Sequence, residues 1–332
     1  MTEVVSGADI ISDVISAVHG SAMVITDSNV ARLYPQLTEN AFVIPAGERS
    51  KNKDVLFDIL SEMSHRNVRR GDAVTAVGGG VVGDITGLAA ALYMRGIDFI
   101  NVPTTLLSMV DSGIGGKTAV NHCGIKNLIG AFKPPLRTVI SYAFLETLDD
   151  REWLCGTGEL IKTCLLTENA FERLNLKLDG LIKHDRNDVY DLIETCIDIK
   201  SRVVRADPTE LRLRKILNVG HTVAHALESI NGDKFTHGEY VLKGMLTECA
   251  MFKDMIDPEY YARMIGIFKM FTDPPRTSSK FVCDVAAHDK KNVDNDIRLM
   301  IPTNKGEVSE ISVTNDAFIS RYESALKELK RV

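Results

Sequence analysis

The sequence predicts an α/β domain with a mostly parallel, Rossmann-like sheet, followed by a mainly α-helical domain. Short β-rich runs alternate with helical patterns in the first half, which is typical of βαβ units. After about residue 148 the pattern changes to long amphipathic helices. The length of 332 residues also exceeds what one hydrophobic core usually serves. We therefore expect two domains, residues 1–147 and 148–332.

The expected elements of the first domain follow one another in regular alternation. Runs rich in apolar and β-branched residues predict strands at 21–26, 41–45, 72–77, 97–102 and 138–141. Apolar residues at helical spacing predict the helices between them, at 29–36, 52–67 and 84–95.

The second domain is expected to be built from five long helices. Apolar stripes of helical period predict them at 158–176, 186–206, 219–231, 239–255 and 258–271. One short β-like run, at 297–302, returns near the end.

Composition excludes several classes of protein. A net charge of −6 argues against a general nucleic-acid binder. The chain has no apolar run of about 18 residues and no basic, apolar leader, so we expect no membrane span and no signal peptide. The six cysteines are scattered without a C-x-x-C pair, which fits reduced thiols in a cytoplasmic enzyme.

Three histidines predict a metal site. His221 and His225 are spaced i and i+4, on one face of an expected helix, and His237 precedes the next helix. Imidazoles gathered in this way, with a carboxylate from elsewhere, can supply a three-ligand catalytic zinc site, although surface helices also carry such histidine pairs by chance.

A glycine-rich turn follows the strand at 72–77. Gly78, Gly80 and Gly83 match G-x-G-x-x-G in the strand–turn–helix context of a dinucleotide loop. The usual acidic partner, at the end of the next strand, is missing, because Asp98 stands at its start. The turn is therefore either a dinucleotide loop of different wiring or a tight packing turn.

Two further motifs follow. Thr104 and Thr105 come at the end of a strand, where open α/β sheets bind ligands, although either could simply cap a helix. Gly-Gly-Lys-Thr at 115–118 suggests a P-loop, but position 111 holds Asp111 instead of the required glycine. We reject the ATPase interpretation and expect a flexible, glycine-rich loop here.

Charged residues gather around the histidine segment. Taken singly, each cation could be a solvated side chain, and Glu159 with Lys162 could be an ordinary i,i+3 pair. Together they would suit a small, multiply anionic substrate beside a metal. The group comprises Glu159, Lys162, Lys200, Glu210, Arg214 and the run Asp289-Lys290-Lys291.

The chain resembles the 3-dehydroquinate synthase family from about Thr26 to Pro302. The resemblance rests on segments in the family's order: Gly-Gly-Gly-Val-Val-Gly-Asp (78–84), Tyr-Met-Arg-Gly-Ile (93–97), Val-Pro-Thr-Thr-Leu-Leu (102–107), Gly-Gly-Lys-Thr-Ala-Val-Asn (115–121), Asn-Leu-Ile-Gly-Ala-Phe (127–132), Glu-Leu-Ile-Lys (159–162) and Leu-Asn-Val-Gly-His-Thr (217–222). It implies conversion of 3-deoxy-D-arabino-heptulosonate 7-phosphate to 3-dehydroquinate and phosphate. The implied steps are transient oxidation by NAD⁺, phosphate elimination, re-reduction and aldol closure, in a homodimer containing zinc or cobalt.

The resemblance also implies roles for individual residues. It assigns the metal to Glu159, His221 and His237. It assigns NAD to Asp27, Asn29, Glu48, Lys51, Gly79, Gly80, Asp84, Thr104, Thr105, Lys126 and Thr147. It assigns substrate binding to Arg95, Asp111, Lys117, Asn127, Lys162, Lys200, Arg214, Asn218 and one of Lys290 and Lys291, and it assigns proton handling to Glu210 and His225.

Three other functions remain as alternatives. A sister cyclase that makes an inosose or valiolone would share zinc, NAD and the elimination. The resemblance, however, ties Arg214, Asn218 and His225, with Lys290 and Lys291, to a carboxylated substrate. A metal- and NAD-dependent polyol dehydrogenase would give net NADH and would not need so many cations. A nucleotide-sensing module would have no use for three metal ligands.

Overall fold

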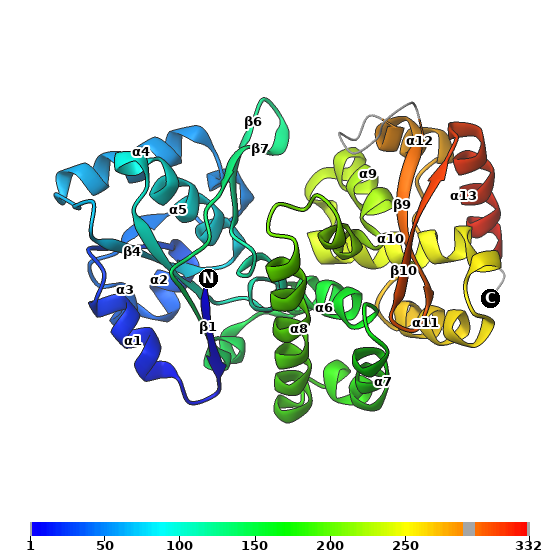
Figure 1. Cartoon of the computed structure of the whole chain (residues 1–332), viewed down its shortest axis with the longest axis horizontal. Helices are drawn as coiled ribbons and strands as arrows, with labels where there is room; N and C mark the ends of the chain where they lie inside the picture. Colours follow the sequence, from blue (N-terminus) through cyan, green and yellow to red (C-terminus); the bar gives the residue numbers. More distant parts are fainter. Residues whose placement is uncertain (1, 288–295, 331–332) are drawn as a thin grey trace. The chain divides into compact units, whose positions relative to one another are not determined.

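The computed structural model describes residues 2–287 and 296–330, and these residues divide into two compact units, unit 1 up to Trp153 and unit 2 from Leu154 onward (Figure 1). The predicted fold class, an α/β unit followed by a mainly helical unit, is confirmed. No helix in the described part of the chain is long and apolar enough to cross a bilayer.

Unit 1 contains a sheet of six parallel strands within residues 2–153. The strands lie in the spatial order β1 (Glu3–Gly7), β8 (Arg137–Ser141), β5 (Asp98–Pro103), β4 (Ala73–Gly78), β2 (Met23–Asp27) and β3 (Phe42–Ile44). The central strands are buried on both faces, so they read as continuous apolar runs. Five of them were predicted, and β1 was not.

Helices cover both faces of this sheet (Figure 1). One side carries α1 (Ile11–His19), α2 (Ser28–Leu33) and α3 (Pro35–Thr38), and the other carries α4 (Lys53–His65) and α5 (Gly80–Leu92). Right-handed crossovers explain this division, because the chain moves outward through β2 and β3 and then returns through β4 and β5. A hydrophobic core cluster of the unit lies between the sheet and helices α4 and α5.

The prediction of a flexible, glycine-rich loop around Lys117 is wrong. These residues form an antiparallel hairpin of β6 (Lys117–His122) and β7 (Ile125–Phe132). The prediction failed because β7 is mostly exposed on both faces, so its sequence lacks the apolar alternation that marks a half-buried strand. Short helical turns complete the unit at Glu48–Ser50, Tyr93–Arg95, Ser108–Ser112 and Tyr142–Thr147.

Unit 2 is mainly helical. Its helices are α6 (Asp150–Cys164, which begins in unit 1), α7 (Glu168–Ile182), α8 (Arg186–Ala206), α9 (His221–Asn231), α10 (His237–Met251), α11 (Pro258–Phe271), α12 (Ser279–Ala287) and α13 (Asn315–Leu329). Turns at Leu213–Asn218, Gly232–Lys234 and Lys253–Met255 connect them. Strands β9 (Ile297–Asn304) and β10 (Glu307–Val313) form an antiparallel pair.

The prediction of one continuous helix at 158–176 is wrong, because parts of two helices occupy this region. Helix α6 ends at Cys164, and Thr167 starts α7 as an N-cap whose hydroxyl accepts the amide of Ala170 at 3.3 Å. Leu165 and Leu166 are buried in the turn, so the apolar pattern continues across the break.

Candidate functional site

Three side chains with ligating atoms converge in unit 2. The ligand atoms of Glu159, His221 and His237 all lie within 4.8 Å of one another. The Nε2 atoms of His221 and His237 lie 3.4 and 3.3 Å from the same oxygen of Glu159, which is fully buried. Two imidazole nitrogens and one carboxylate are the donor set of many catalytic zinc sites.

Close helix packing places the two histidines. Each is the first residue of its helix and adjoins a glycine, Gly220 before His221 and Gly238 after His237. A Cβ built on Gly244 of α10 would lie 2.0 Å from the carbonyl oxygen of Gly220. Helices α9 and α10 therefore meet backbone to backbone beside the ligands, where only glycine fits.

The second nitrogen of each imidazole lies beside a hydrogen-bond acceptor. Nδ1 of His221 lies 3.1 Å from the carbonyl oxygen of Val219, which can only accept, so Nδ1 carries the proton. Nδ1 of His237 lies 3.4 Å from a carboxylate oxygen of Glu228. Both rings thus turn Nε2 toward Glu159, as metal-ligating histidines do, and the donor set fits a divalent metal.

Charge interactions around Glu159 keep it ionised. Burial alone would raise the pKa of Glu159, but Lys162 and the two histidines outweigh burial and lower the pKa well below its usual range. Burial lowers the pKa of His221 to about 4. Burial acts the same way on His237, but Glu159 and Glu228 outweigh it and raise the pKa to about 10.

His225 lies beside the three ligands but outside their group. Its ring centroid is 5.2 Å from that of His221 and 6.2 Å from that of His237. The ligating atoms of His221 and His237 gather around Glu159, so the structure groups these two histidines with that carboxylate and leaves His225 outside the group.

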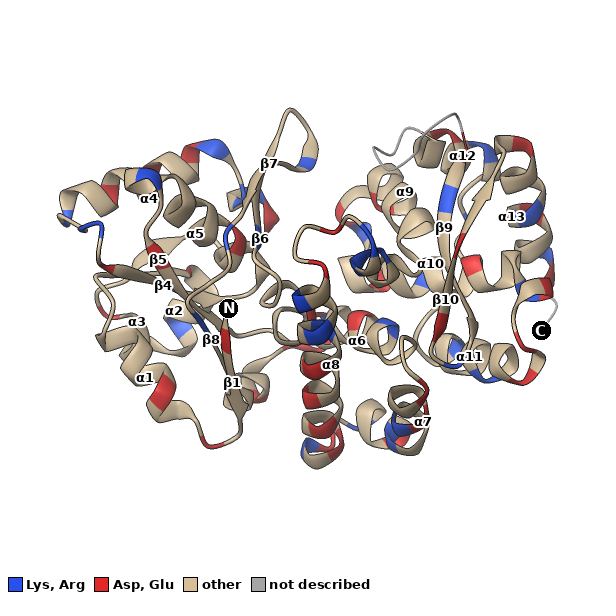
Figure 2. Ribbon diagram, viewed as in Figure 1, with Lys and Arg blue, Asp and Glu red and all other residues tan. Residues whose placement is uncertain are grey.

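Buried cations are the second feature of unit 2. Lys162, Lys200 and Arg214 are at most 4% exposed, and Lys162 forms an ion pair with Glu159. Lys200 belongs to the basic C-terminal end of α8, whose earlier turns are acidic (Figure 2). Buried positive charge is costly unless it is paired or binds an anion.

A loop before α9 holds two more of the predicted residues. Asn218 donates a hydrogen bond of 3.0 Å from Nδ2 to Oε1 of Glu210, whose φ is 60°. Asp207 organises this loop by accepting the backbone amides of Leu211, Arg212 and Arg214 at 2.7–3.0 Å.

In unit 1, four predicted residues share one polar network. Nζ of Lys51, which is 5% exposed, donates to Asp84 and, at 2.6 Å, to Oδ1 of Asn127. Asn121 completes the network, because its Nδ2 donates to Oε1 of Glu48 at 2.7 Å and its Oδ1 accepts the amide of Asn127 at 2.8 Å.

The charge on Asp84 depends on its neighbours. Burial raises the pKa of Asp84, and Lys51 opposes this increase. The negative charges of Glu48 and Asp111 raise the pKa further, so Asp111 also acts on this network.

The glycine turn has the strand–turn–helix geometry that its sequence predicts. Gly79 is the N-cap of α5, directly after β4, and the amide of Thr104 donates to the carbonyl oxygen of Gly78 at 3.0 Å. A Cβ on Gly80 would lie 2.9 Å from Oγ of Ser112, and one on Gly78 would lie 2.5 Å from Val82. Tight packing against Val82 thus explains why position 78 is glycine. The backbone amides of the turn remain candidates for binding a nucleotide.

The remaining predicted residues of unit 1 lie in several places. Asp27 caps α2 by accepting the amides of Asn29 and Val30 at 2.8 and 3.1 Å, and the hydroxyl of Thr147 lies 2.7 Å from that of Tyr34. Oγ1 of Thr105 accepts the amide of Ser108 at 3.2 Å, as a helix cap does.

Three more predicted cations belong to other parts of unit 1, and Lys117 lines a small hollow together with Asp84. Lys117 and Lys126 are exposed on the hairpin, where Gly-Gly-Lys-Thr leads into a strand instead of the helix that a P-loop requires. Arg95 lies beyond the C-terminal end of α5, whereas Asp84 lies near the start of that helix. Lys290 and Lys291 lie outside the described residues.

Sequence reasoning gave no role to Asn121, Asp207, Glu228 and Glu248. Asn121 was within a motif of the resemblance, which was the one available signal. The contacts of the two glutamates join different helices, so no local pattern reveals them.

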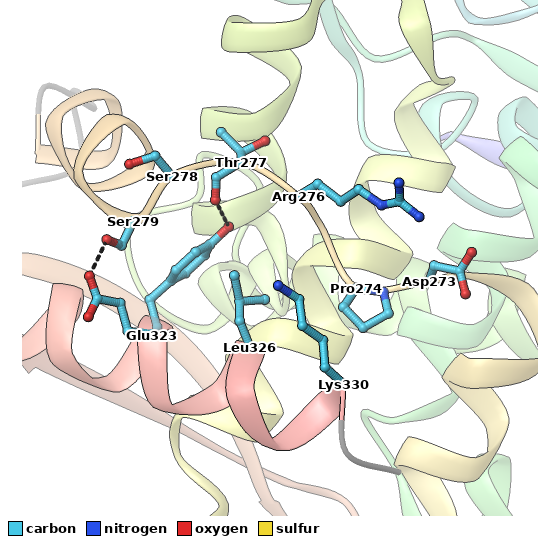
Figure 3. A pocket seen from close by; sticks show the side chains of 10 residues that line it. Asp273, Pro274, Arg276, Thr277, Ser278, Ser279, Glu323, Leu326 and Lys330 are labelled. Atoms are coloured by element: carbon cyan, nitrogen blue, oxygen red, sulfur yellow. Dashed lines mark hydrogen bonds between the residues drawn. The ribbon is translucent and has the colours of Figure 1, made fainter.

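A hollow lies between the segment 273–279 and α13 (Figure 3). It shares no lining residue with the group of Glu159, His221 and His237 or with the network of Lys51. Ser279 donates to Glu323 at 2.8 Å and Tyr322 donates to the carbonyl oxygen of Thr277 at 3.4 Å across it. Its charged side chains are of both signs, and no predicted site residue lines it.

Comparisons with known proteins agree in both units. The family model for the 3-dehydroquinate synthase N-terminal part matches residues 41–155, and the model for the C-terminal part matches residues 156–292. A 3-dehydroquinate synthase of Alkaliphilus metalliredigens (strain QYMF) is 38% identical over 88% of this chain and 86% of its own length. One from Thermoanaerobacter sp. (strain X514) is 38% identical over 92% of this chain and 89% of its own length.

A solved structure has a closely similar fold. The 2-epi-5-epi-valiolone synthase from Streptomyces hygroscopicus subsp. jinggangensis 5008, solved with NAD⁺ and Zn²⁺ bound, superposes with a TM-score of 0.90. It is 25% identical, and the match covers 100% of this chain and 97% of that one.

Proposed function

This chain belongs to the 3-dehydroquinate synthase family, and from that premise we propose that it converts 3-deoxy-D-arabino-heptulosonate 7-phosphate to 3-dehydroquinate and phosphate with NAD⁺ and zinc. The observation that carries the proposal is the group of Glu159, His221 and His237, with both Nε2 atoms aimed at one oxygen. The similar valiolone synthase structure contains the same two cofactors.

The metal is proposed to bind Glu159, His221 and His237. When bound, a zinc or cobalt ion would lower the pKa of a substrate hydroxyl that it coordinates. The buried ion pair with Lys162 helps to lower the pKa of Glu159. The carboxylate of Glu159 is therefore ionised, which is the form that would coordinate a metal cation. His225, at 5.2 Å from His221 between ring centroids, is close enough to this group to handle a substrate proton.

NAD is proposed to bind unit 1. When bound, NAD⁺ would take up a hydride from the substrate and return it, so no NADH would accumulate. The amides of Gly79 and Gly80 at the start of α5 would face the pyrophosphate, because a helix N-terminus attracts anions. The other proposed contacts are Asp27, Asn29, Glu48, Lys51, Asp84, Thr104, Thr105, Lys126 and Thr147.

The anionic groups of the substrate need several cations. Lys162, Lys200 and Arg214 in unit 2, and Arg95 and Lys117 in unit 1, are proposed to hold its carboxylate and phosphate and to favour the departing phosphate. Glu210 is proposed to exchange protons with the substrate, with Asn218 orienting its carboxylate at 3.0 Å. Asp111, Asn127 and one of Lys290 and Lys291 complete the proposed substrate contacts.

A homodimer is part of the proposal, since the family resemblance implies it, and a cytoplasmic location is proposed from the scattered cysteines. Light scattering after size-exclusion chromatography would give a mass near twice 36.6 kDa. A single-chain mass at micromolar concentration would contradict the dimer.

The sister cyclases provide the second candidate function, which the fold of the valiolone synthase favours. A substrate panel decides between them. Phosphate release should be fast with the carboxylated heptulosonate phosphate and absent with the uncarboxylated sugar phosphates that inosose- and valiolone-forming cyclases use. The reverse order would replace the proposed reaction with that of a sister cyclase.

A further inference from the structure

Glu248 is a buried carboxylate at the beginning of α9. It lies on α10 and is 1% exposed, and its two oxygens accept the amides of Gly220 at 3.1 Å and Val223 at 2.8 Å. The first amides of a helix have no partner within the helix, and a side chain just before the helix usually accepts them. Here that position is Gly220, which has no side chain, so Glu248 supplies the cap from another helix.

The two amides that Glu248 accepts lie on either side of a proposed metal ligand in the sequence. His221 is the first residue of α9 and lies between the two residues whose amides Glu248 holds. A carboxylate at a helix N-terminus is also favoured by the helix dipole, which offsets part of the cost of burying its charge. The backbone that carries His221 is therefore fixed to α10.

Glu228 makes the opposite connection. It lies near the end of α9, and its side chain is 13% exposed. Its carboxylate lies 3.4 Å from Nδ1 of His237, the first residue of α10. This contact leaves Nε2 of His237 directed at Glu159, at 3.3 Å.

The two helices thus hold each other's histidine. Helix α9 carries His221 and the carboxylate that orients His237, while α10 carries His237 and the carboxylate that caps the helix of His221. We propose that Glu228 and Glu248 are a reciprocal pair of positioning residues that set the geometry of the two histidine ligands. The inference rests on the metal site of the proposed function, and it extends that site to two residues that do not touch the metal.

The test is metal binding to the full chain, measured for Glu228→Gln and Glu248→Gln. Zinc affinity is determined by competition with a chromophoric chelator, and the absorption spectrum of the cobalt-loaded protein reports ligand geometry. Loss of a partner that orients a ligand typically weakens metal binding by about 10- to 100-fold, and we expect this loss together with a changed cobalt spectrum. NAD affinity should stay as in the wild type.

Two neighbours give matched controls. Thr247→Val alters a buried side chain next to Glu248 whose hydroxyl donates within α10, to the carbonyl oxygen of Lys243 at 2.7 Å. Ser229→Ala alters an exposed side chain next to Glu228. Both should bind zinc as the wild type does. If Glu248→Gln does not fold, Glu248→Asp decides instead, because it keeps the charge but reaches less far.

The outcomes separate this inference from the proposed function. If the wild type binds one zinc and His221→Ala loses it, the metal site stands. Wild-type zinc affinity and cobalt spectra in both glutamate variants would then overturn the inference alone, even if their melting temperatures fall. If the wild type itself binds no zinc or cobalt, the metal site fails and the inference fails with it.

Discussion

Gly238 packs against the backbone of Cys155: a Cβ built on Gly238 would lie 1.8 Å from the carbonyl oxygen of that cysteine. The contact brings the start of α10, which carries His237, against α6, which carries Glu159. Two of the three proposed metal ligands are thus placed by an approach between helices that no other residue at position 238 allows.

Gly238→Ala should therefore destabilise the protein and weaken metal binding. Forcing a methyl group into this contact must move one helix, and overpacking of this kind costs about 1–3 kcal/mol. We expect a lower melting temperature and a lower zinc affinity, measured by calorimetry and by chelator competition. Gly266→Ala is the control, because a Cβ on this exposed glycine of α11 meets nothing within 4 Å. That variant should be neutral or slightly more stable.

His237→Ala should remove the metal without removing NAD. The change deletes one of three ligands, so the zinc content of the purified protein should fall from one per chain to background, and phosphate release should stop. NAD binding, followed by fluorescence titration, should be unchanged. His184→Asn is a suitable control, because it alters an exposed histidine of unit 2 whose φ of 56° asparagine tolerates. A full complement of zinc in His237→Ala would contradict the assignment.

Lys117→Ala should reduce turnover far more than NAD affinity. Lys117 is proposed to stabilise the departing phosphate, and loss of one such charge-stabilising group typically costs about 100-fold or more in kcat. Steady-state kinetics and NAD titration measure the two effects. Lys133→Ala, which alters a lysine just beyond the hairpin that pairs only weakly with Asp98 at 3.9 Å, should retain turnover. Weaker NAD binding with full turnover at saturating NAD⁺ would exclude the role of Lys117.

Acid should break an ion-pair cluster in unit 2 by protonating the carboxylate of Glu172. Arg263 donates to both oxygens of Glu172 at 2.6 and 2.9 Å, and Lys305 lies 2.9 Å away. Hydrogen bonds from Arg263 and then Lys305 lower the pKa of Glu172 from 4.5 to about 2. Because the folded-state pKa is below the unfolded value, the stabilisation is complete above about pH 4.5 and is lost as the pH falls toward 2.

Glu172→Gln tests this cluster. The variant should be less stable than the wild type at pH 7, by less than about 1 kcal/mol because the side chains are partly exposed. The difference between the two proteins should shrink between pH 4.5 and pH 3 in urea unfolding. A difference that does not change with pH would show that the charge of Glu172 contributes nothing.

The sequence predicted the regular elements best where periodicity was strong and the ends were marked. The bounds of α8 and α11 agree with the prediction at both ends, and each begins after an aspartate N-cap, Asp185 or Asp257. The hairpin was missed because its strand β7 is mostly exposed and lacks a buried face. The break before Thr167 was missed because the apolar pattern runs through it.

The site was predictable only in part, for a related reason. Short motifs and the family resemblance pointed to Glu159, His221 and His237, which the structure brings together. The residues that hold them are determined by tertiary contacts between distant positions, such as Glu248 with Gly220, 28 residues apart. The apolar residues around Glu248 mark α10 as a buried helix, but they do not indicate that its carboxylate accepts amides of α9.

The central claim is an elimination of phosphate with recycled NAD at the metal group of unit 2. Its most direct test follows phosphate release from 3-deoxy-D-arabino-heptulosonate 7-phosphate with NAD⁺ and zinc, while absorbance at 340 nm is recorded in the same sample. We predict phosphate without lasting NADH, and no reaction after treatment with EDTA until zinc is restored. Lasting NADH without phosphate would contradict the account and indicate a dehydrogenase.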